Sequence, residues 1–376
     1  DLNANSGDIY AQRYDAAGVA QGAAILVNGT TANTQFEPSV AMAADGRFVV
    51  TWSSQSQDSA SDLGVYARLY AADGTASGAE FRVNTTVAND QRYSKVGIDN
   101  NGNFVVVFTD YSVTGGDVYA QRYNAAGVAQ GTNFLVNTSL TNFQSFADID
   151  VHPTSGDFII VWESLQDGIS TDVYGQRFNA AGIAQASEFR ANTTTTNIQE
   201  SAKVAYAADG SFAVAWESND GSTLDMMVRR YDASGTALTG EITANTYTTS
   251  TQRWGDLTFV GSNSFVVTWG SQGQDGDGHG VYAQQFNAAT GAKIGSELRV
   301  STSTTNDQWF PSIAIQGSNA VIVWRGNGTQ TSNVDSAGVF MQRLNVTGLA
   351  GFTVTPTYGL TTTEAGGTAQ FSVVLD

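Results

Sequence analysis

Short, almost continuous apolar runs return along the whole chain, separated by stretches rich in Gly, Asn, Asp, Ser and Thr. Phe48–Trp52, Phe158–Trp162 and Phe265–Trp269 are three of these runs. An apolar run of this length between turn residues is typical of a β-strand that is covered on both faces. No long stretch places apolar residues at helical spacing, so the pattern predicts an all-β chain.

A second pattern follows each apolar run and ends in a turn. Val118–Gly127 reads Val-Tyr-Ala-Gln-Arg-Tyr-Asn-Ala-Ala-Gly, and copies of it occur seven times at a spacing of about 54 residues. Tyr119 and Tyr123 fall on one side of an extended strand, and the Asn-Ala-Ala-Gly end has turn composition. Repeats of this period indicate a propeller or a solenoid.

Each repeat reads as four strands. The first strand follows an Asn-x-Gln triplet, the second is the apolar run, the third contains the Tyr motif, and the fourth resembles Phe81–Asn84. Four short antiparallel strands per repeat are typical of a propeller blade, and neighbouring blades must cover its two faces. We therefore expect an all-β β-propeller of four-stranded antiparallel blades. The Arg that recurs within the third strand is expected to bond a neighbouring blade, at Arg13, Arg122, Arg177, Arg230 and Arg343.

The number of blades is harder to predict, because the sequence contains seven third-strand motifs and six clear apolar second strands. We expect seven blades, with residues 352–376 joining residues 8–28 or with partner strands lying upstream of residue 1. Six blades with overhanging ends are the alternative. Residues 1–350 are then the propeller, and residues 351–376 are either its closing strands or the start of a following immunoglobulin-like module.

Composition and charge limit the classes of partner that the chain is expected to bind. The formal net charge of −18 disfavours nucleic acid and anionic membranes, both of which require basic patches. The chain contains no cysteine, which excludes disulfides and thiolate metal sites. It also has no apolar run of about 18 residues, so we expect no membrane insertion.

The loops between the second and third strands vary in length and are acidic. Calcium binds carboxylate and carbonyl oxygens of Gly-rich loops, and Gln274–Gly280 has that composition. The candidate ligands are Asp58, Asp62, Asp167, Asp172, Asp275 and Asp277. The alternative is that these carboxylates cap turns and keep the surface soluble.

The Asn-x-Gln triplets allow two interpretations. The amides could be buried latches that tie a crossing segment to backbone, or they could line a binding face together with the residues beside them. Those neighbours differ from blade to blade and include the candidate ligand-face residues Tyr93, Trp254, Trp309 and Phe310. Aromatic rings beside polar groups suit sugar-binding or protein-binding surfaces.

Catalytic machinery has little support in the sequence. His152 and His279 lie in different loops and predict no metal-binding or nucleophile-activating pair. A carboxylate pair for glycoside hydrolysis is compatible with the sequence, because its members could come from different blades. We expect that the protein is not an enzyme.

The repeats also resemble a known family. Phe265–Trp269, Ser271–Gly276, Val118–Gly127 and Phe134–Thr138 together resemble repeats of large bacterial secreted proteins that are adhesin-like and often of the repeats-in-toxin type. The tail Phe352–Leu375 is similar to the opening of Calx-beta-like immunoglobulin-type modules. The resemblance implies an extracellular or cell-surface location on a bacterium, and calcium binding there.

The expected function is a non-catalytic extracellular adhesion or structural module of a large bacterial surface or matrix protein. It would be stabilised by calcium and able to associate with copies of itself. A glycan-binding, lectin-like propeller is the second interpretation, and a secreted hydrolase is the third. The expected partner is a cell-surface or matrix protein, or a glycan.

Overall fold

The computed structural model describes residues 7–58, 62–113, 115–219, 221, 223–327 and 338–346, and the backbone of residues 352–354 and 371–375. All of its regular elements are β-strands. Among the residues described, no helix is long and apolar enough to cross a membrane. The chain divides into two compact units, Asp1–Arg190 with Gly367–Asp376, and Ala191–Gly366.

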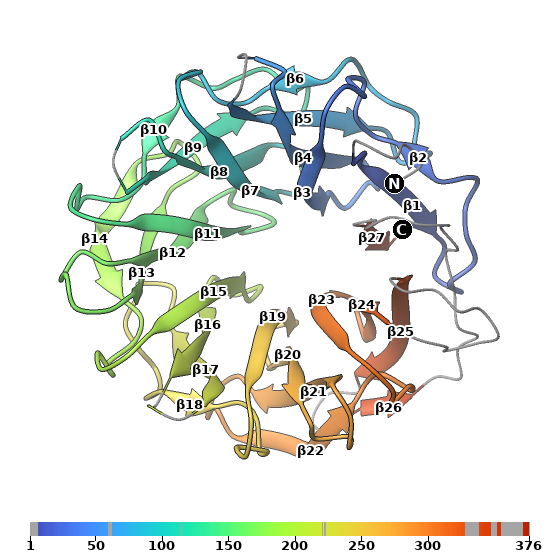
Figure 1. Cartoon of the computed structure of the whole chain (residues 1–376), viewed down its shortest axis with the longest axis vertical. Helices are drawn as coiled ribbons and strands as arrows, with labels where there is room; N and C mark the ends of the chain where they lie inside the picture. Colours follow the sequence, from blue (N-terminus) through green and yellow to red (C-terminus); the bar gives the residue numbers. More distant parts are fainter. Residues whose placement is uncertain are drawn as a thin grey trace. The chain divides into compact units, whose positions relative to one another are not determined.

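The first unit contains three four-stranded antiparallel sheets, here called blades 1 to 3 (Figure 1). Blade 1 consists of β3 (Gln35–Met42), β4 (Phe48–Gln55), β5 (Leu63–Tyr70) and β6 (Phe81–Arg82). Blade 2 consists of β7 (Gln91–Ile98), β8 (Phe104–Asp110), β9 (Asp117–Tyr123) and β10 (Phe134–Leu135). Blade 3 consists of β11 (Gln144–Val151), β12 (Phe158–Ser164), β13 (Asp172–Phe178) and β14 (Ala184–Arg190).

The second unit contains three more such sheets, blades 4 to 6 (Figure 1). Blade 4 consists of β15 (Gln199–Tyr206), β16 (Phe212–Asn219), β17 (Leu224–Tyr231) and β18 (Ile242–Thr243). Blade 5 consists of β19 (Gln252–Val260), β20 (Ser264–Gln272), β21 (His279–Asn287) and β22 (Lys293–Arg299). Blade 6 consists of β23 (Gln308–Gln316), β24 (Asn319–Gly326), β25 (Gly338–Val346) and β26 (Phe352–Val354).

The all-β propeller with four-stranded antiparallel blades is confirmed, but the expected number of seven blades is wrong. The described residues form six four-stranded blades. The first copy of the Tyr motif instead lies in a three-stranded sheet of the order β2 (Ile25–Leu26), β1 (Tyr10–Tyr14), β27 (Phe371–Leu375). There β27 runs parallel to β1, whereas every pair within a blade is antiparallel.

The tail of the chain is only partly described. Strand β26 pairs with β25 and completes blade 6. Residues 351, 355–370 and 376 lie outside the described residues. The division between a propeller that ends at residue 350 and a following module therefore stays a prediction.

The second strand of each blade is its most buried part. All residues of β8 and β12 are buried, which confirms the prediction from the apolar runs. The hydrophobic clusters combine residues of two neighbouring sheets within one unit, and one of them joins Ile9, Ala11 and Val27 to blade 1. One joins blades 1 and 2, one joins blades 2 and 3, and two further clusters join blades 4 to 5 and 5 to 6.

Aromatic pairs connect the second and third strands inside each blade. Trp162 lies in register with Tyr174, and their ring centroids are 6.5 Å apart. Phe158 pairs in the same way with Phe178, at 5.0 Å and an interplanar angle of 13°. The motif tyrosine thus stacks on the Trp of its own blade and contacts the shared cluster from there.

Two of the recurring arginines bond the neighbouring sheet, as predicted, whereas Arg230 donates through Nη2 to the Ser211 hydroxyl group of its own blade at 3.0 Å. Arg13 donates through Nη1 to the carbonyl of Asp73 at 2.7 Å, and Arg122 donates to the carbonyl of Ala180 at 2.9 Å. Both carbonyls belong to the turn after the third strand of the next blade. These arginines therefore hold the repeat together.

A second inter-blade contact was not predicted from the sequence. Glu241, next to the fourth strand of blade 4, accepts hydrogen bonds from the backbone N–H groups of Thr193 and Thr194. Glu188 and Glu297 accept the equivalent bonds from the N–H groups of Thr138 and Thr246, each at 2.8 Å. A carboxylate thus ties the end of one fourth strand to the beginning of the next.

Truncation of the stacked core should destabilise the protein strongly. Phe158 is fully buried, so Phe158→Ala removes a ring and leaves a cavity, which should lower the free energy of unfolding by about 3–5 kcal/mol in urea denaturation. The control Val128→Ala alters a side chain that is 56% exposed and should change that free energy by less than about 0.5 kcal/mol. Equal effects of the two substitutions would contradict the assignment of Phe158 to the core.

The Glu241 contact should make stability depend on pH. Partial burial raises the pKa of Glu241, but the hydrogen bonds from Thr193 and Thr194 outweigh it, and the pKa lies below its ordinary value of 4.5. The folded chain therefore binds this proton less tightly than the unfolded chain does. The stabilisation is present above pH 4.5 and is lost as the pH falls through the lowered pKa.

Comparison with Glu241→Gln measures this contribution. The native chain should have the higher urea midpoint at about pH 7, and the difference should shrink as the pH falls below 4.5 and through the lowered pKa of the native carboxylate. A difference that stays constant over this range would show that the charge of Glu241 does not hold the contact.

Candidate functional site

The first strand of every four-stranded blade carries a β-bulge just after its Gln. The pairing register shifts there in all six blades, and the second residue after the Gln has a positive φ. These residues are Glu37 (57°), Tyr93 (58°), Phe146 (52°), Ser201 (57°), Trp254 (56°) and Phe310 (53°). Left-handed backbone at a residue other than Gly costs about 1–2 kcal/mol. Bulges re-aim side chains, and strained backbone concentrates at functional sites, so these positions are where we sought a site.

In the second unit, one arginine joins two carboxylates. Arg253, on β19, places Nε 2.9 Å from Oε2 of Glu217 and Nη2 3.1 Å from Oε1 of Glu200. Glu200 and Glu217 are direct register partners on β15 and β16. The guanidinium therefore holds a pair of neighbouring acids, one of which is fully buried and the other 27% exposed at its side chain.

Glu217 has an unusual environment for a carboxylate. Its second oxygen accepts the backbone N–H of Trp254 at 2.6 Å. Burial raises the pKa of Glu217, and this effect outweighs the N–H of Trp254 and the charge of Arg253, which both lower it. The carboxyl group therefore retains its proton to a higher pH than an exposed glutamate does.

An aromatic cluster lies beside the acids. The ring of Trp254 is 4.7 Å from that of Phe310 and 5.9 Å from that of Trp309, between centroids. The imidazole of His279 is 5.1 Å from the ring of Trp254, and its Nδ1 lies 2.9 Å from Oδ1 of Asp307. Phe310 is 50% exposed. Apolar ring faces beside fixed charged groups can bind a ligand with both apolar faces and hydroxyl groups.

The cluster has room because the residue beneath Trp254 is small. Gly270 follows Trp269 at the place where Glu217 follows Trp216, and it pairs in register with Arg253. A Cβ atom added at Gly270 would lie 3.2 Å from a ring carbon of Trp254, a tight contact. A larger residue there would press on the indole ring.

The predicted ligand-face residues are thus partly brought together. Trp254, Trp309 and Phe310 form one cluster, while Tyr93 lies in the first unit. The pairing of Glu200 with Glu217 was missed. In the sequence, Glu200 follows the Gln of the first strand and Glu217 follows the Trp of the second strand. Only the strand register shows that the two acids lie opposite each other.

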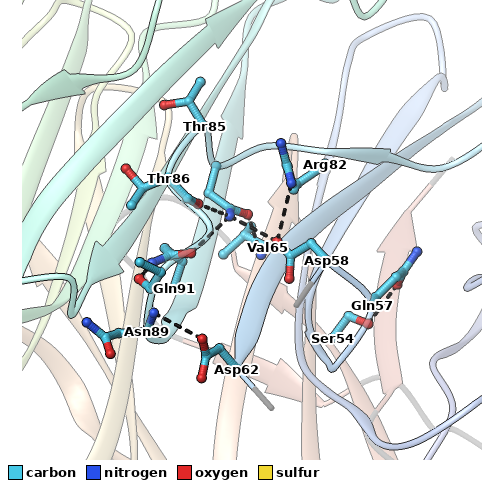
Figure 2. Close-up of polar contacts among 12 residues, drawn as sticks. Ser54, Gln57, Asp58, Asp62, Val65, Arg82, Thr85, Thr86, Asn89 and Gln91 are labelled. Carbon is cyan, nitrogen blue, oxygen red and sulfur yellow. Dashed lines mark hydrogen bonds and ion pairs between the residues drawn. The ribbon is translucent and has the colours of Figure 1, made fainter. Parts of the chain in front are cut away.

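The predicted calcium ligands Asp58 and Asp62 have separate partners (Figure 2). Asp58 is nearly buried, accepts a bond from Nδ2 of Asn84 at 3.2 Å and lies 3.8 Å from Nη1 of Arg82. Asp62 accepts the backbone N–H of Asn89 at 3.1 Å. Both carboxylates hold the crossing between blades 1 and 2.

The other four predicted ligands also bind protein groups. Asp167 accepts the N–H of Ile169, and Asp172 lies 3.5 Å from Nη1 of Arg190. Asp277 accepts the N–H of Asn306 at 3.0 Å, and Oδ1 of Asp275 accepts the N–H of Asp277 at 3.5 Å, while Oδ2 of Asp275 has no hydrogen-bond partner among the described residues. Within the described parts of the chain, no group of three or more His, Asp or Glu side chains could hold a metal ion. The contacts support the turn-capping alternative, and calcium binding stays a prediction.

The Asn-x-Gln triplets act as latches. The Gln side chains are buried, and Gln144, Gln199 and Gln252 accept the indole N–H of the Trp in their own blade at 3.0, 3.0 and 3.1 Å. The Asn residues have left-handed backbone, which Asn tolerates better than most residues. These are Asn33, Asn89, Asn142, Asn197 and Asn306. The Gln amides therefore act as buried latches at the entry to the first strand, whereas the five Asn residues are exposed.

No protein-family model matches the sequence, and none of the curated proteins matches it. Solved structures do share its fold. A protein of unknown function from Dyadobacter fermentans has a TM-score of 0.54 and 11% identity, with 82% of this chain and 94% of that chain covered. An α-L-arabinanase of Penicillium chrysogenum, complexed with arabinobiose, has a TM-score of 0.53 and 12% identity, covering 81% and 92%.

A third similar structure is the α-L-arabinofuranosidase Arb93A of Fusarium graminearum in complex with an iminosugar inhibitor. Its TM-score is 0.53 and its identity 11%, and the match covers 90% of this chain and 98% of that chain. At this identity the likeness shows the fold, a β-propeller. The resemblance to repeats-in-toxin-type adhesins and to a Calx-beta-like tail finds no support in these comparisons.

The comparisons correct two expectations. The prediction of a non-catalytic adhesion module, and of a protein that is not an enzyme, is wrong, because the solved propellers of similar structure include an arabinanase and an arabinofuranosidase. The physical reason for the error is that the repeated residues report the scaffold. The residues that differ between blades are the candidates for a site.

Proposed function

We propose that the second unit carries a glycoside hydrolase site for short arabinose-containing oligosaccharides. One observation carries this proposal: Glu200 and Glu217 share the guanidinium of Arg253 beside the aromatic cluster of Trp254, Trp309 and Phe310. The arabinobiose bound by the Penicillium chrysogenum arabinanase of similar fold supports the choice of sugar.

Glycoside hydrolysis uses two carboxyl groups that differ in protonation. One donates a proton to the departing oxygen, and a raised pKa suits it for this task. The raised pKa of Glu217 assigns it the acid role. Glu200, which is partly exposed, is assigned the second role, as base or nucleophile.

The burial of Glu217 sets a requirement on this mechanism. Its carboxyl group has no exposed surface, and both oxygens are occupied by Arg253 and by the N–H of Trp254. Arg253 is 36% exposed at its side chain, so it is the group that a sugar would meet first. We infer that a bound sugar turns the guanidinium aside and takes its place next to Glu217.

The aromatic rings would bind the sugar rings by their faces. Phe310 is half exposed and lies against Trp254, so the two rings offer an apolar surface next to Arg253. Sugar hydroxyl groups would bond the charged groups, whose hydrogen bonds are stronger than those between neutral groups. Phe310→Ala should therefore raise KM more than it lowers kcat.

Hydrolysis of arabinobiose and of longer arabino-oligosaccharides tests the proposal, with released arabinose measured by chromatography. Glu200→Gln and Glu217→Gln should each lower kcat by about 100-fold or more, as expected when an acid or base is removed. Glu241→Gln is the matched control. It makes the same substitution in the same unit, at a carboxylate that binds Thr193 and Thr194, and should retain turnover at neutral pH.

Two outcomes would contradict the proposal. Binding of arabino-oligosaccharides without release of arabinose would show a site that recognises the sugar and does not cleave it. A Glu217→Gln variant that raises KM while kcat stays unchanged would show that Glu217 only positions Trp254 and Arg253.

An extracellular location stays a prediction that accompanies this proposal. A glycan partner is compatible with the comparisons, because the Penicillium chrysogenum structure contains arabinobiose. Association of the chain with copies of itself or with a cell-surface protein gains no support from them and forms no part of the proposal.

A further inference from the structure

The first unit contains an arrangement that matches the site of the second. Arg92, on β7, donates through Nη2 to Oε1 of Glu37 at 2.8 Å. The other oxygen of Glu37 accepts the backbone N–H of Tyr93 at 3.3 Å. Arg253 and the N–H of Trp254 bind Glu217 in the same way.

The aromatic part also matches. The ring of Tyr93 lies 4.4 Å from that of Phe146, as the ring of Trp254 lies 4.7 Å from that of Phe310. The guanidinium of Arg92 sits 4.1 Å from the ring centroid of Tyr93. Phe146 is 39% exposed, compared with 50% for Phe310.

The order of these groups along the chain is the same in both units. A carboxylate comes from blade 1 or 4, a Gln-Arg-aromatic sequence from blade 2 or 5, and a Phe at the strained bulge position from blade 3 or 6. The same kind of arrangement thus occurs in both units. Its recurrence argues against surface residues that have no function. Blade packing does not require them either, because the equivalent positions of the remaining blades hold other residues.

The two arrangements carry their carboxylates at different positions. Glu37 lies at the bulge position that Ser201 occupies in blade 4, and Phe36 stands where blade 4 has Glu200. Ser53 follows Trp52 at the place where Glu217 follows Trp216, and it pairs with Phe36 as Glu217 pairs with Glu200. Its hydroxyl donates to Oε2 of Glu37 at 2.9 Å. The guanidinium of Arg92 thus pairs with one carboxylate, whereas that of Arg253 pairs with two. In consequence Nε of Arg92, whose counterpart in Arg253 binds Glu217, has no hydrogen-bond partner among the described residues.

We propose that the first unit holds a second binding site, for a neutral arabino-oligosaccharide, which binds the sugar without cleaving it. The choice of ligand rests on the function proposed for the second unit. The charges of Arg92 and Glu37 offset each other, which suits a neutral ligand. The rings of Tyr93 and Phe146 supply an apolar face, and the partly exposed side chains of Arg92 and Glu37 can bond hydroxyl groups. Cleavage would need a second carboxyl group, which Ser53 does not provide.

Binding stoichiometry tests the proposal. Isothermal titration calorimetry of the Glu200→Gln chain with arabinotriose, in which turnover is suppressed, should give two equivalents of sugar per chain. Adding Phe146→Ala should weaken one of the two sites by about tenfold or more, equivalent to about 1.4 kcal/mol. Adding Phe310→Ala should weaken the other site instead.

The control is Val128→Ala, which removes apolar surface from an exposed turn of the first unit and should leave two equivalents. Should Phe146→Ala lower the melting temperature, Phe146→Leu replaces it, because it retains apolar volume while removing the ring.

The outcomes separate this proposal from the one before it. A single equivalent that Phe310→Ala removes and Phe146→Ala leaves intact would overturn the second site, whether or not arabinose is released. Two equivalents, one sensitive to each substitution, would support it even if the native chain released no arabinose. In that last case only the proposed hydrolase activity would be lost.

Discussion

The two-sided burial of the second strand in each blade is the constraint on which the rest of the structure depends. A four-stranded sheet cannot cover both of its own faces, so β8 and β12 lose contact with water only because successive blades share their hydrophobic clusters. Each blade must therefore repeat the same spacing of aromatic and β-branched residues. The Arg and Glu contacts between blades add polar bonds to this packing, and they recur for the same reason.

This packing is strong enough to hold a strained backbone at one place in each blade. Tyr93, Phe146 and Trp254 are bulky residues with positive φ, a conformation that a locally independent strand would avoid. The bulge turns one side chain per blade out of the regular alternation of the strand. Because the scaffold fixes the backbone, the side chain at this position is free to vary. The six blades thus carry different side chains at this position. A candidate site forms where successive blades place charged and aromatic side chains next to each other.

The features that recur in every repeat could be predicted from the sequence. The contacts that depend on the pairing register of the strands could not. The apolar runs, the turns after the Tyr motif and the contacts of Arg13 and Arg122 with the neighbouring sheet follow from local pattern and are correct. The count of seven blades is wrong because the sheet that contains the motif at Tyr10 has three strands among the described residues: β1 pairs with β2 and, in parallel, with β27 of the tail. Trp254, Trp309 and Phe310 could be selected because they differ between repeats. The pair of Glu200 and Glu217 could not, because the bulge shifts the pairing on β15 and places the two acids opposite each other.

The raised pKa of Glu217 indicates that this residue does not serve the stability of the fold at neutral pH. Because burial raises this pKa, the folded chain holds the proton of Glu217 more tightly than the unfolded chain does. Its contribution to the free energy of unfolding is therefore largest below the ordinary glutamate pKa and declines as the pH rises through the raised one. Glu241 behaves in the opposite sense, since its hydrogen bonds lower its pKa and favour the folded chain at neutral pH. At neutral pH the contact of Glu241 therefore stabilises the fold, whereas Glu217 destabilises it. A buried acid that opposes stability at neutral pH, while Ser53 fills the equivalent place in the first unit, is better explained by chemistry than by packing.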